Sequence, residues 1–258
     1  MSLIKSIPNS ITSLNLLSGC LAVIFALSGS FKSALICIIA SAVFDFFDGL
    51  AARALKAYSN IGKELDSLAD MVSFGVAPAM IMLTYSRILV ETNFAIFNGQ
   101  GTISNFTANL MIFLPLLIAV FSALRLAKFN VDTRQTENFI GLATPSCALL
   151  CASLVYATEV YEPLATFFAV YPYTIPMIAL VLSYLLVSEI PMFSFKFKSL
   201  RWSENKLKFI FLICAAAFAI IEATLMGSFP LSVWIFTVLV FYILLNTSIW
   251  AYRALLKK

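Results

Sequence analysis

Four of the five aspartates in this chain lie between residues 45 and 70, inside a sequence that is otherwise strongly hydrophobic. They are Asp45, Asp48, Asp66 and Asp70. A carboxylate at membrane depth costs about 2.5–3.5 kcal/mol even on the insertion scales that give low values. Bound divalent cations would offset this cost, because their positive charge neutralises the carboxylates. The cluster is therefore a candidate cation site and a candidate reaction centre.

The composition is that of an integral membrane protein. Hydrophobic residues make up 61% of the chain and charged residues 12%, with a mean hydropathy of +0.96, whereas soluble domains carry about 25% charged residues. The chain has no histidine, which excludes histidine metal ligands and histidine general bases. Its five cysteines show neither a disulfide framework nor zinc-site spacing.

Hydropathy and helix-breaking residues predict about eight transmembrane helices, and so an all-α polytopic bundle in one domain over residues 1–258. The predicted spans are 11–29, 33–56, 62–89, 106–128, 144–161, 172–190, 207–226 and 231–252. Residues 157–172 are predicted to form an interfacial loop, because glutamates and prolines interrupt the apolar sequence there.

The distribution of basic residues predicts how the chain is oriented. With the N-terminus in the cytoplasm, 15 of the 17 Lys and Arg residues fall on the cytoplasmic side, and only Lys32 and Arg87 fall on the other. An even number of spans also places the C-terminus, with Lys257 and Lys258, in the cytoplasm. The expected location is a prokaryotic cell membrane, with the aspartates toward the cytoplasmic half.

The spacing of the aspartates predicts one shared site. Asp45 and Asp48 are three residues apart and Asp66 and Asp70 are four apart, so each pair lies on one face of its helix. Asp48 and Asp70 each lie eleven residues from Ser59, in the turn between the helices. In an antiparallel hairpin the four carboxylates would converge at one depth, which suits a pair of hard cations.

The neighbouring residues fit a phosphate ligand. Gly49, Ala52 and Gly62 are small enough to let a helix or a ligand approach closely. Arg53 suits phosphate oxygens, and Ser59 is a further donor.

Two other interpretations of the acidic cluster remain open from spacing alone. The carboxylates could form interhelical polar contacts or ion pairs with Arg53, Lys56 and Lys63, although four acids against one well-placed Arg leave an excess. They could also line a divalent-cation pathway, as acidic clusters do in channels. Arg53 argues against the pathway, since conducted cations gain nothing from it.

Residues 45–70 read D-x2-D-G-x2-A-R-x8-G-x3-D-x3-D. This pattern resembles the signature of the CDP-alcohol phosphotransferase family at every fixed position. Members of that family join an alcohol to the phosphorus of a CDP-linked molecule and release CMP. The resemblance implies a helical membrane bundle, usually a homodimer, with two Mg²⁺ or Mn²⁺ ions.

Further stretches within residues 7–150 are similar to one branch of that family, the bacterial and archaeal membrane-type phosphatidylserine synthases. They are IPNSITSLNLLSG, GKELDSLADMVSFGVAPA, RLAKFNVD and FIGLATPSCA. The similarity implies transfer of the phosphatidyl group from CDP-diacylglycerol to the hydroxyl of L-serine, giving phosphatidylserine and CMP. Glycerol 3-phosphate, inositol phosphate and choline are the alternative acceptors.

The resemblance also implies roles for the acidic and donor-binding residues. Asp45, Asp48 and Asp66 would hold the metal pair, and Asp70 would help to coordinate it and act as the general base. The residues expected to bind CDP-diacylglycerol are Pro8, Asn9, Thr12, Asp48, Gly49, Ala52, Arg53, Ser59 and Gly62.

The acceptor residues are expected near the end of the fourth span. Arg125 and Lys128 are the candidates for the serine carboxylate, although both also suit anchors whose charges extend to the membrane surface. Ser67, Ser73 and Asn130 could add hydrogen bonds. The polar segment 132–138 is interpreted as a connector or a lid over the acceptor. Glu222 and Asn246 are interpreted as residues that form interhelical hydrogen bonds or lie at the membrane interface.

Overall fold

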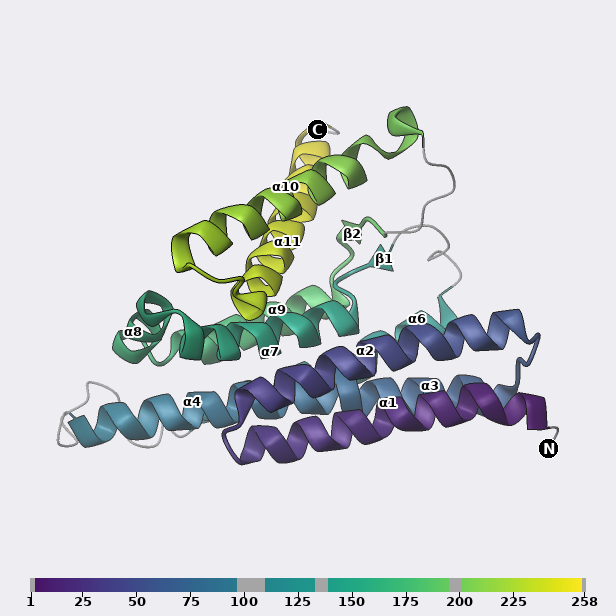
Figure 1. Cartoon of the computed structure of the whole chain (residues 1–258), viewed down its shortest axis with the longest axis horizontal. Helices are drawn as coiled ribbons and strands as arrows, with labels where there is room; N and C mark the ends of the chain where they lie inside the picture. The colour runs from purple at the N-terminus through teal and green to yellow at the C-terminus, as the bar shows by residue number, and fades with distance from the viewer. Residues whose placement is uncertain (1–2, 97–109, 133–138, 195–200, 257–258) are drawn as a thin grey trace.

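The computed structural model describes residues 3–96, 110–132, 139–194 and 201–256, and most of them are helical (Figure 1). The helices are α1 (Leu3–Leu27), α2 (Phe31–Ala54), α3 (Asn60–Asp70), α4 (Ala77–Ile96), α6 (Leu116–Val131), α7 (Thr144–Val160), α8 (Glu162–Val170), α9 (Thr174–Val187), α10 (Trp202–Met226) and α11 (Leu231–Leu255). A π-helical segment, η1 (Met71–Val76), joins α3 to α4. Two short strands, β1 (Phe139–Ile140) and β2 (Pro191–Met192), pair antiparallel.

The helical membrane bundle is confirmed in outline. Within the described ranges, six helical segments are long and apolar enough to cross a membrane: Ser6–Leu27, Phe31–Ala54, Asn60–Thr92, Leu110–Val131, Trp202–Met226 and Leu231–Leu255. The pair α8 and α9, bent by 97°, makes a seventh if it is one broken span. Helix α7 is apolar but has 17 residues, and a span needs about 20. The count of eight and the cytoplasmic orientation stay predictions, and Lys257 and Lys258 lie outside the described residues.

The interfacial loop expected at residues 157–172 is wrong. Helix α7 continues to Val160, and α8 begins at Glu162. Two of the residues that suggested a loop, Glu162 and Pro163, instead start α8. Pro163 lies in the first turn, where a backbone N–H would have no partner within the helix, so its absence costs nothing. Glu162 also places its charge at the positive end of the helix dipole.

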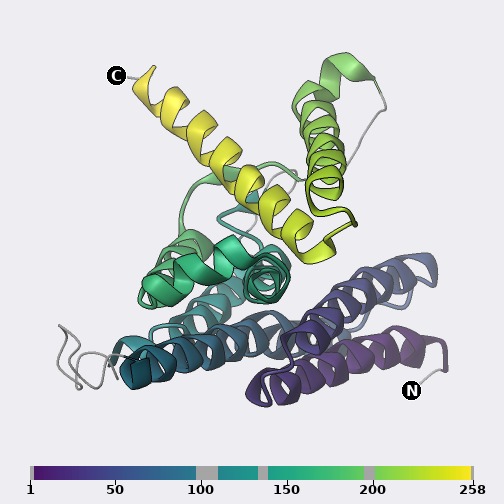
Figure 2. The same ribbon diagram turned by 60° about the vertical axis from the view of Figure 1, so that its left-hand side comes forward.

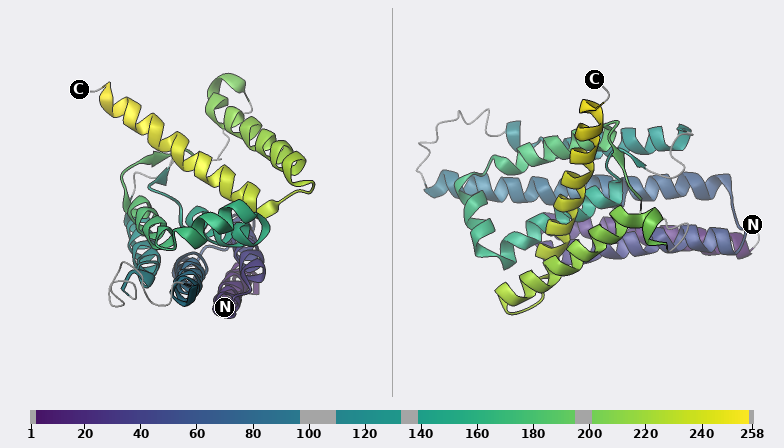
Figure 3. Two further views of the ribbon diagram at one scale, coloured as in Figure 1. Left: turned by 90° about the vertical axis from the view of Figure 1, so that its left-hand side faces the viewer. Right: turned by 90° about the horizontal axis from the view of Figure 1, so that it is seen from above.

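The helices form a bundle from which the C-terminal pair leans away. Helices α1 and α2 pack along each other, and α1 also contacts α3, η1 and α4 (Figure 1). Helix α7 packs on α2 and α4, and α9 packs on α6. Helix α11 crosses α7 and pairs with α10, and both slope away from the other helices (Figures 2 and 3).

Close packing at a glycine and hydrogen bonds from serines connect α1 to α2 and η1. A Cβ atom at Gly19 would lie 2.7 Å from the Cα of Ser73, so only glycine fits at this contact. The Asn15 carbonyl accepts hydrogen bonds from Ser41 Oγ at 3.2 Å and Ser73 Oγ at 3.0 Å. These contacts hold together the three segments that carry or adjoin the aspartates.

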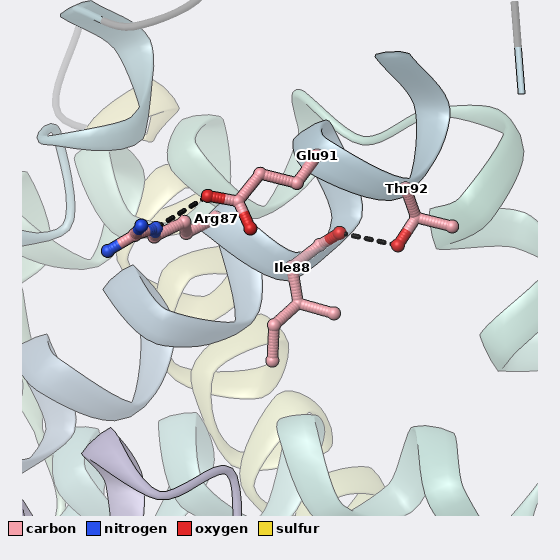
Figure 4. A network of polar contacts seen from close by, with 4 residues as sticks. All are labelled: Arg87, Ile88, Glu91 and Thr92. Carbon is pink, nitrogen blue, oxygen red and sulfur yellow. Dashed lines mark hydrogen bonds and ion pairs between the residues drawn. The ribbon is translucent and has the colours of Figure 1, made fainter. Parts of the chain in front are cut away.

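An exposed ion pair marks the far end of α4. Arg87 Nε donates to Glu91 Oε1 at 2.6 Å, and Thr92 Oγ1 donates to the Ile88 carbonyl at 2.7 Å (Figure 4). Both charged side chains are largely exposed, so the pair adds little stability. It lies at the opposite end of the α3–α4 helix from the aspartates (Figure 1).

Candidate functional site

Three aspartates meet where α2 passes α3. One carboxylate oxygen from each of Asp45, Asp48 and Asp66 lies within 4.8 Å of the other two. Asp48 is buried, and the other two are partly buried. Such a set of oxygen ligands could hold a divalent metal ion, because Mg²⁺ and Mn²⁺ prefer carboxylate oxygens.

Basic residues lie near the aspartates but are not paired with them in the described part of the chain. Among the described residues, no Lys or Arg forms an ion pair with any of the four, so ion pairing with Arg53, Lys56 or Lys63 does not explain them. Arg125 interacts with Asp70 electrostatically, but at longer range than an ion pair. Because buried charges are normally paired or bound to metal ions, the geometry favours a cation.

Asp70 lies at the junction of α3 and η1, outside the set of three mutually close carboxylates. Its Oδ1 accepts a hydrogen bond from Asn15 Nδ2 at 3.1 Å. It also interacts electrostatically with Asp45 and Asp66. The π-helical turn starts at the next residue, and such turns are frequent at functional sites. Asp70 is thus close to the three carboxylates, and its own hydrogen-bond partner is the amide of Asn15.

Helix α1 supplies side chains that orient two of the carboxylates. Thr12 Oγ1 donates to Asp48 Oδ2 at 2.6 Å, and Asn15 bonds Asp70 from one turn further along. Both α1 side chains are buried. Asn15 is a site residue that the sequence patterns did not single out. The sequence feature that could have identified Asn15 is its position three residues after Thr12, which places its amide on the same face of an apolar helix.

A cleft of about 240 Å³ opens beside the cluster. Its lining residues are Pro8, Asn9, Thr12, Asp48, Gly49, Ala52, Arg53, Ala57, Tyr58, Ser59, Gly62, Lys63 and Asp66. All nine residues expected to bind CDP-diacylglycerol lie in this lining. The structure therefore brings together side chains from α1, α2 and the start of α3.

Local structure explains two of these lining residues. Ser59 caps α3, because its Oγ accepts a hydrogen bond from the Gly62 N–H at 2.9 Å. A Cβ atom at Gly62 would lie 3.0 Å from Asn9 Oδ1, so glycine lets α1 approach closely. Arg53 is exposed in the lining and provides its positive charge.

Arg125 and Lys128 line a second cleft, of about 310 Å³, and are absent from the lining of the first. The second lining comprises Arg125, Lys128, Val131, Asp132, Ile140, Leu186, Val187, Ser188 and Glu189. Arg125 is buried and its Nε has no hydrogen-bond partner among the described residues. The cleft therefore carries charges of both signs.

The second cleft lies next to the segment that follows Asp70. Ser122 lies one turn before Arg125 on α6. A Cβ atom at Gly75 of η1 would lie 3.2 Å from Ser122 Cβ, which measures how closely the two helices pack. With the electrostatic interaction between Arg125 and Asp70, this packing brings the Arg125 cleft toward the aspartates.

The remaining candidates for serine hydrogen bonds have protein partners. Asn130 Nδ2 donates to Ser67 Oγ at 2.9 Å, which links α6 to α3. Ser73 Oγ donates to the Asn15 carbonyl. Of the polar segment 132–138, residues 133–138 lie outside the described residues, so the connector or lid interpretation stays a prediction.

Comparison with known proteins identifies the family of this chain. The CDP-alcohol phosphatidyltransferase family matches residues 5–192. A CDP-diacylglycerol–serine O-phosphatidyltransferase of Bacillus subtilis is 35% identical over 190 residues, covering 74% of this chain and 91% of the relative.

Two further relatives extend the similarity. An enzyme with the same name from Helicobacter pylori is 34% identical over 157 residues, covering 60% of this chain and about three fifths (59%) of the relative. An archaetidylserine synthase of Methanothermobacter thermautotrophicus is 32% identical over 176 residues, covering 67% of each chain. With the family match over most of its length and the aspartate motif inside that match, this chain belongs to the CDP-alcohol phosphatidyltransferase family.

Proposed function

We propose that this protein transfers the phosphatidyl group from CDP-diacylglycerol to the hydroxyl of L-serine, releasing CMP. The observation that carries the proposal is the set of three close carboxylates at the side of the first cleft, with which no described Lys or Arg forms an ion pair. The names of the relatives point to serine as the acceptor. A homodimer is part of the proposal on the family resemblance alone.

The donor would bind in the first cleft. Arg53 and the small residues Gly49 and Gly62 suit a pyrophosphate, because they offer positive charge and close approach. An apolar groove of about 480 Å³ between α2, α7 and α11 includes Phe46 and Phe47, the two residues between Asp45 and Asp48. This groove could take an acyl chain while CDP stays in the polar cleft.

Asp45, Asp48 and Asp66 would hold two divalent cations, Mg²⁺ or Mn²⁺, with Asp70 beside them. Their close oxygens fit such ions, and so does the absence of an ion pair to any Lys or Arg that the structure describes. When bound, the cations supply positive charge that stabilises the pyrophosphate and the attacked phosphorus. Thr12 would keep Asp48 oriented as a ligand through its hydrogen bond.

Asp70 would accept the proton of the serine hydroxyl as the oxygen attacks the lipid-bearing phosphorus. A bond then forms between that oxygen and phosphorus, while the pyrophosphate bond breaks and CMP leaves. Asn15 holds one oxygen of Asp70 by its hydrogen bond, which leaves the other to receive the proton. No Ser, Cys or His nucleophile is needed, so a single in-line displacement is expected.

The acceptor would bind in the second cleft. Serine carries a carboxylate and an ammonium group. Arg125 and Lys128 suit the carboxylate. Asp132 and Glu189 lie in the same lining, so a phosphorylated acceptor would meet negative charge there, which favours an unphosphorylated acceptor. The test is CMP release with serine, glycerol 3-phosphate or inositol phosphate as the acceptor; CMP release that requires one of the phosphorylated acceptors would contradict the serine assignment.

Replacing Arg125 should weaken serine binding selectively. We expect Arg125→Ala to raise the serine KM by roughly 10- to 100-fold, because a charge-assisted hydrogen bond contributes about 1.5–3 kcal/mol. The CDP-diacylglycerol KM should stay near the wild-type value. Arg125→Lys should give a smaller rise, since it keeps the charge and loses the planar fork.

The matched control is Arg87→Ala, which removes an exposed arginine at the far end of α4 (Figure 4). It should leave both KM values unchanged. Wild-type serine kinetics in the folded Arg125 variants would remove Arg125 from the acceptor site.

A further inference from the structure

Two polar side chains of α11 bind a single residue of the segment that follows β2. Tyr242 Oη donates to the Phe193 carbonyl at 2.8 Å, and the Phe193 N–H donates to Asn246 Oδ1 at 3.0 Å. The Asn246 amide also donates to the Tyr242 carbonyl at 2.7 Å, which fixes its orientation. Both side chains are buried and lie four residues apart on one helix face. Asn246 therefore bonds to a backbone segment between helices, whereas an interhelical bond or a place at the membrane interface was expected.

Aromatic packing supports this attachment. The Phe193 ring meets Tyr242 edge-on at 5.0 Å between centroids, and it meets Phe211 of α10 at 5.6 Å. Such edge-on aromatic pairs add stability beyond the burial of their area. The C-terminal helix pair therefore holds Phe193 by both its backbone and its ring.

Strand β2 connects the segment held by α11 to residues that line the second cleft. Strand β2 pairs with β1, and the Gly141 N–H donates to the Ile190 carbonyl at 2.9 Å. A Cβ atom at Gly141 would lie 2.7 Å from the Leu186 carbonyl oxygen, so the two segments are in close contact. Residues 186–189 and Ile140 line the cleft opposite Arg125 and Lys128. Displacing Phe193 would therefore displace this wall.

Tyr242, one of the two residues that bind Phe193, also lies near Arg125, which lines the second cleft. Arg125 and Tyr242 lie close enough to interact electrostatically. Arg125 is buried, and Tyr242 is therefore near the cation that would bind the acceptor as well as bonded to Phe193. The part of α11 that makes these contacts lies beyond residues 5–192, which the family shares.

We infer that Tyr242 and Asn246 are positioning residues for the acceptor, which hold the wall of the Arg125 cleft from a helix outside the region matched by the family. The inference rests on the proposed function, because it assigns that cleft to serine. Neither residue touches the reacting atoms. Acceptor affinity should therefore depend on them, whereas donor affinity and the rate at saturating serine should not.

The test compares Tyr242→Phe and Asn246→Leu with the wild type. Tyr242→Phe removes only the hydroxyl, and we expect the serine KM to rise about three- to tenfold, as loss of one hydrogen bond would give. The double variant should raise it further. The CDP-diacylglycerol KM and the turnover at saturating serine should stay within about twofold of the wild type.

The control is Thr247→Val, next to Asn246. The Thr247 hydroxyl bonds only to carbonyls of its own helix in the described structure. This variant should therefore leave the serine KM unchanged. If Asn246→Leu fails to fold, the nearly isosteric Tyr242→Phe decides the question.

The outcomes separate the two proposals. Failure of the wild type to form phosphatidylserine would reject the proposed function itself. Formation of the product with an unchanged serine KM in Tyr242→Phe would overturn the positioning role alone. Equal rises in the KM values for serine and donor would also overturn it, since they indicate general loosening of the fold.

Discussion

Replacing Asp70 by Asn is expected to lower turnover by roughly 10²–10⁴-fold, the usual contribution of a positioned general base. The asparagine side chain keeps the shape of the carboxylate but cannot accept the serine proton. Its oxygen can still accept the hydrogen bond from Asn15 that Asp70 Oδ1 accepts at 3.1 Å. The local structure and the binding of CDP-diacylglycerol should therefore survive.

The measurement is kcat in mixed micelles, together with donor binding to the purified variant. Glu222→Gln is the matched control, because it replaces a carboxylate in the membrane-spanning segment of α10, outside the cluster. Asp70→Asn with a kcat near that of the control would remove Asp70 from the role of base.

Activity is expected to vanish with EDTA and to return with Mg²⁺ or Mn²⁺. Asp66→Asn should raise the metal concentration that restores half of the activity by more than roughly 100-fold. Loss of an outer partner of a ligand alone costs about 10–100-fold in metal affinity, and Asp66 belongs to the proposed ligand set itself. Titration of activity with metal after chelation gives this concentration.

Glu64→Gln provides the control for Asp66→Asn. Glu64 lies on the same helix, is exposed, and is absent from the carboxylate set. It should need the same metal concentration as the wild type. Full activity of the wild type in excess EDTA would contradict the cation site.

The convergence of the aspartates could be predicted from the sequence, because it depends on local features of the helices and of the turn between them. Helical spacing places Asp45 and Asp48 on one face, and the turn capped by Ser59 brings α3 back beside α2. The set of mutually close carboxylates contains Asp45, Asp48 and Asp66, and Asp70 lies outside that set but close enough to interact with Asp45 and Asp66. The hydrogen bond from Asn15 of α1 to Asp70 is a contact that helical spacing alone does not reveal.

Other features depend on contacts that sequence periodicity does not encode. The π-helical turn at η1 follows Asp70 in the sequence MVSFGV, whose hydrophobic pattern does not distinguish a π-helix from an α-helix. The bond between Asn246 and Phe193 joins residues 53 apart in the sequence. Arg125 and Lys128, the candidates for the serine carboxylate, line a separate cleft that α6 forms with residues 186–189 at the end of α9. Such tertiary contacts decide which of several polar residues share a site.

The central claim is tested most directly by incubating the purified protein with CDP-dioleoylglycerol, labelled L-serine and Mg²⁺ or Mn²⁺, and measuring CMP and labelled lipid together. The account predicts equal amounts of CMP and labelled phosphatidylserine, both dependent on serine and both lost with EDTA. CMP release that requires glycerol 3-phosphate or inositol phosphate would contradict serine as the acceptor. Folded protein that releases no CMP with any acceptor would contradict the reaction itself, and divalent-cation flux into liposomes would then support the cation pathway.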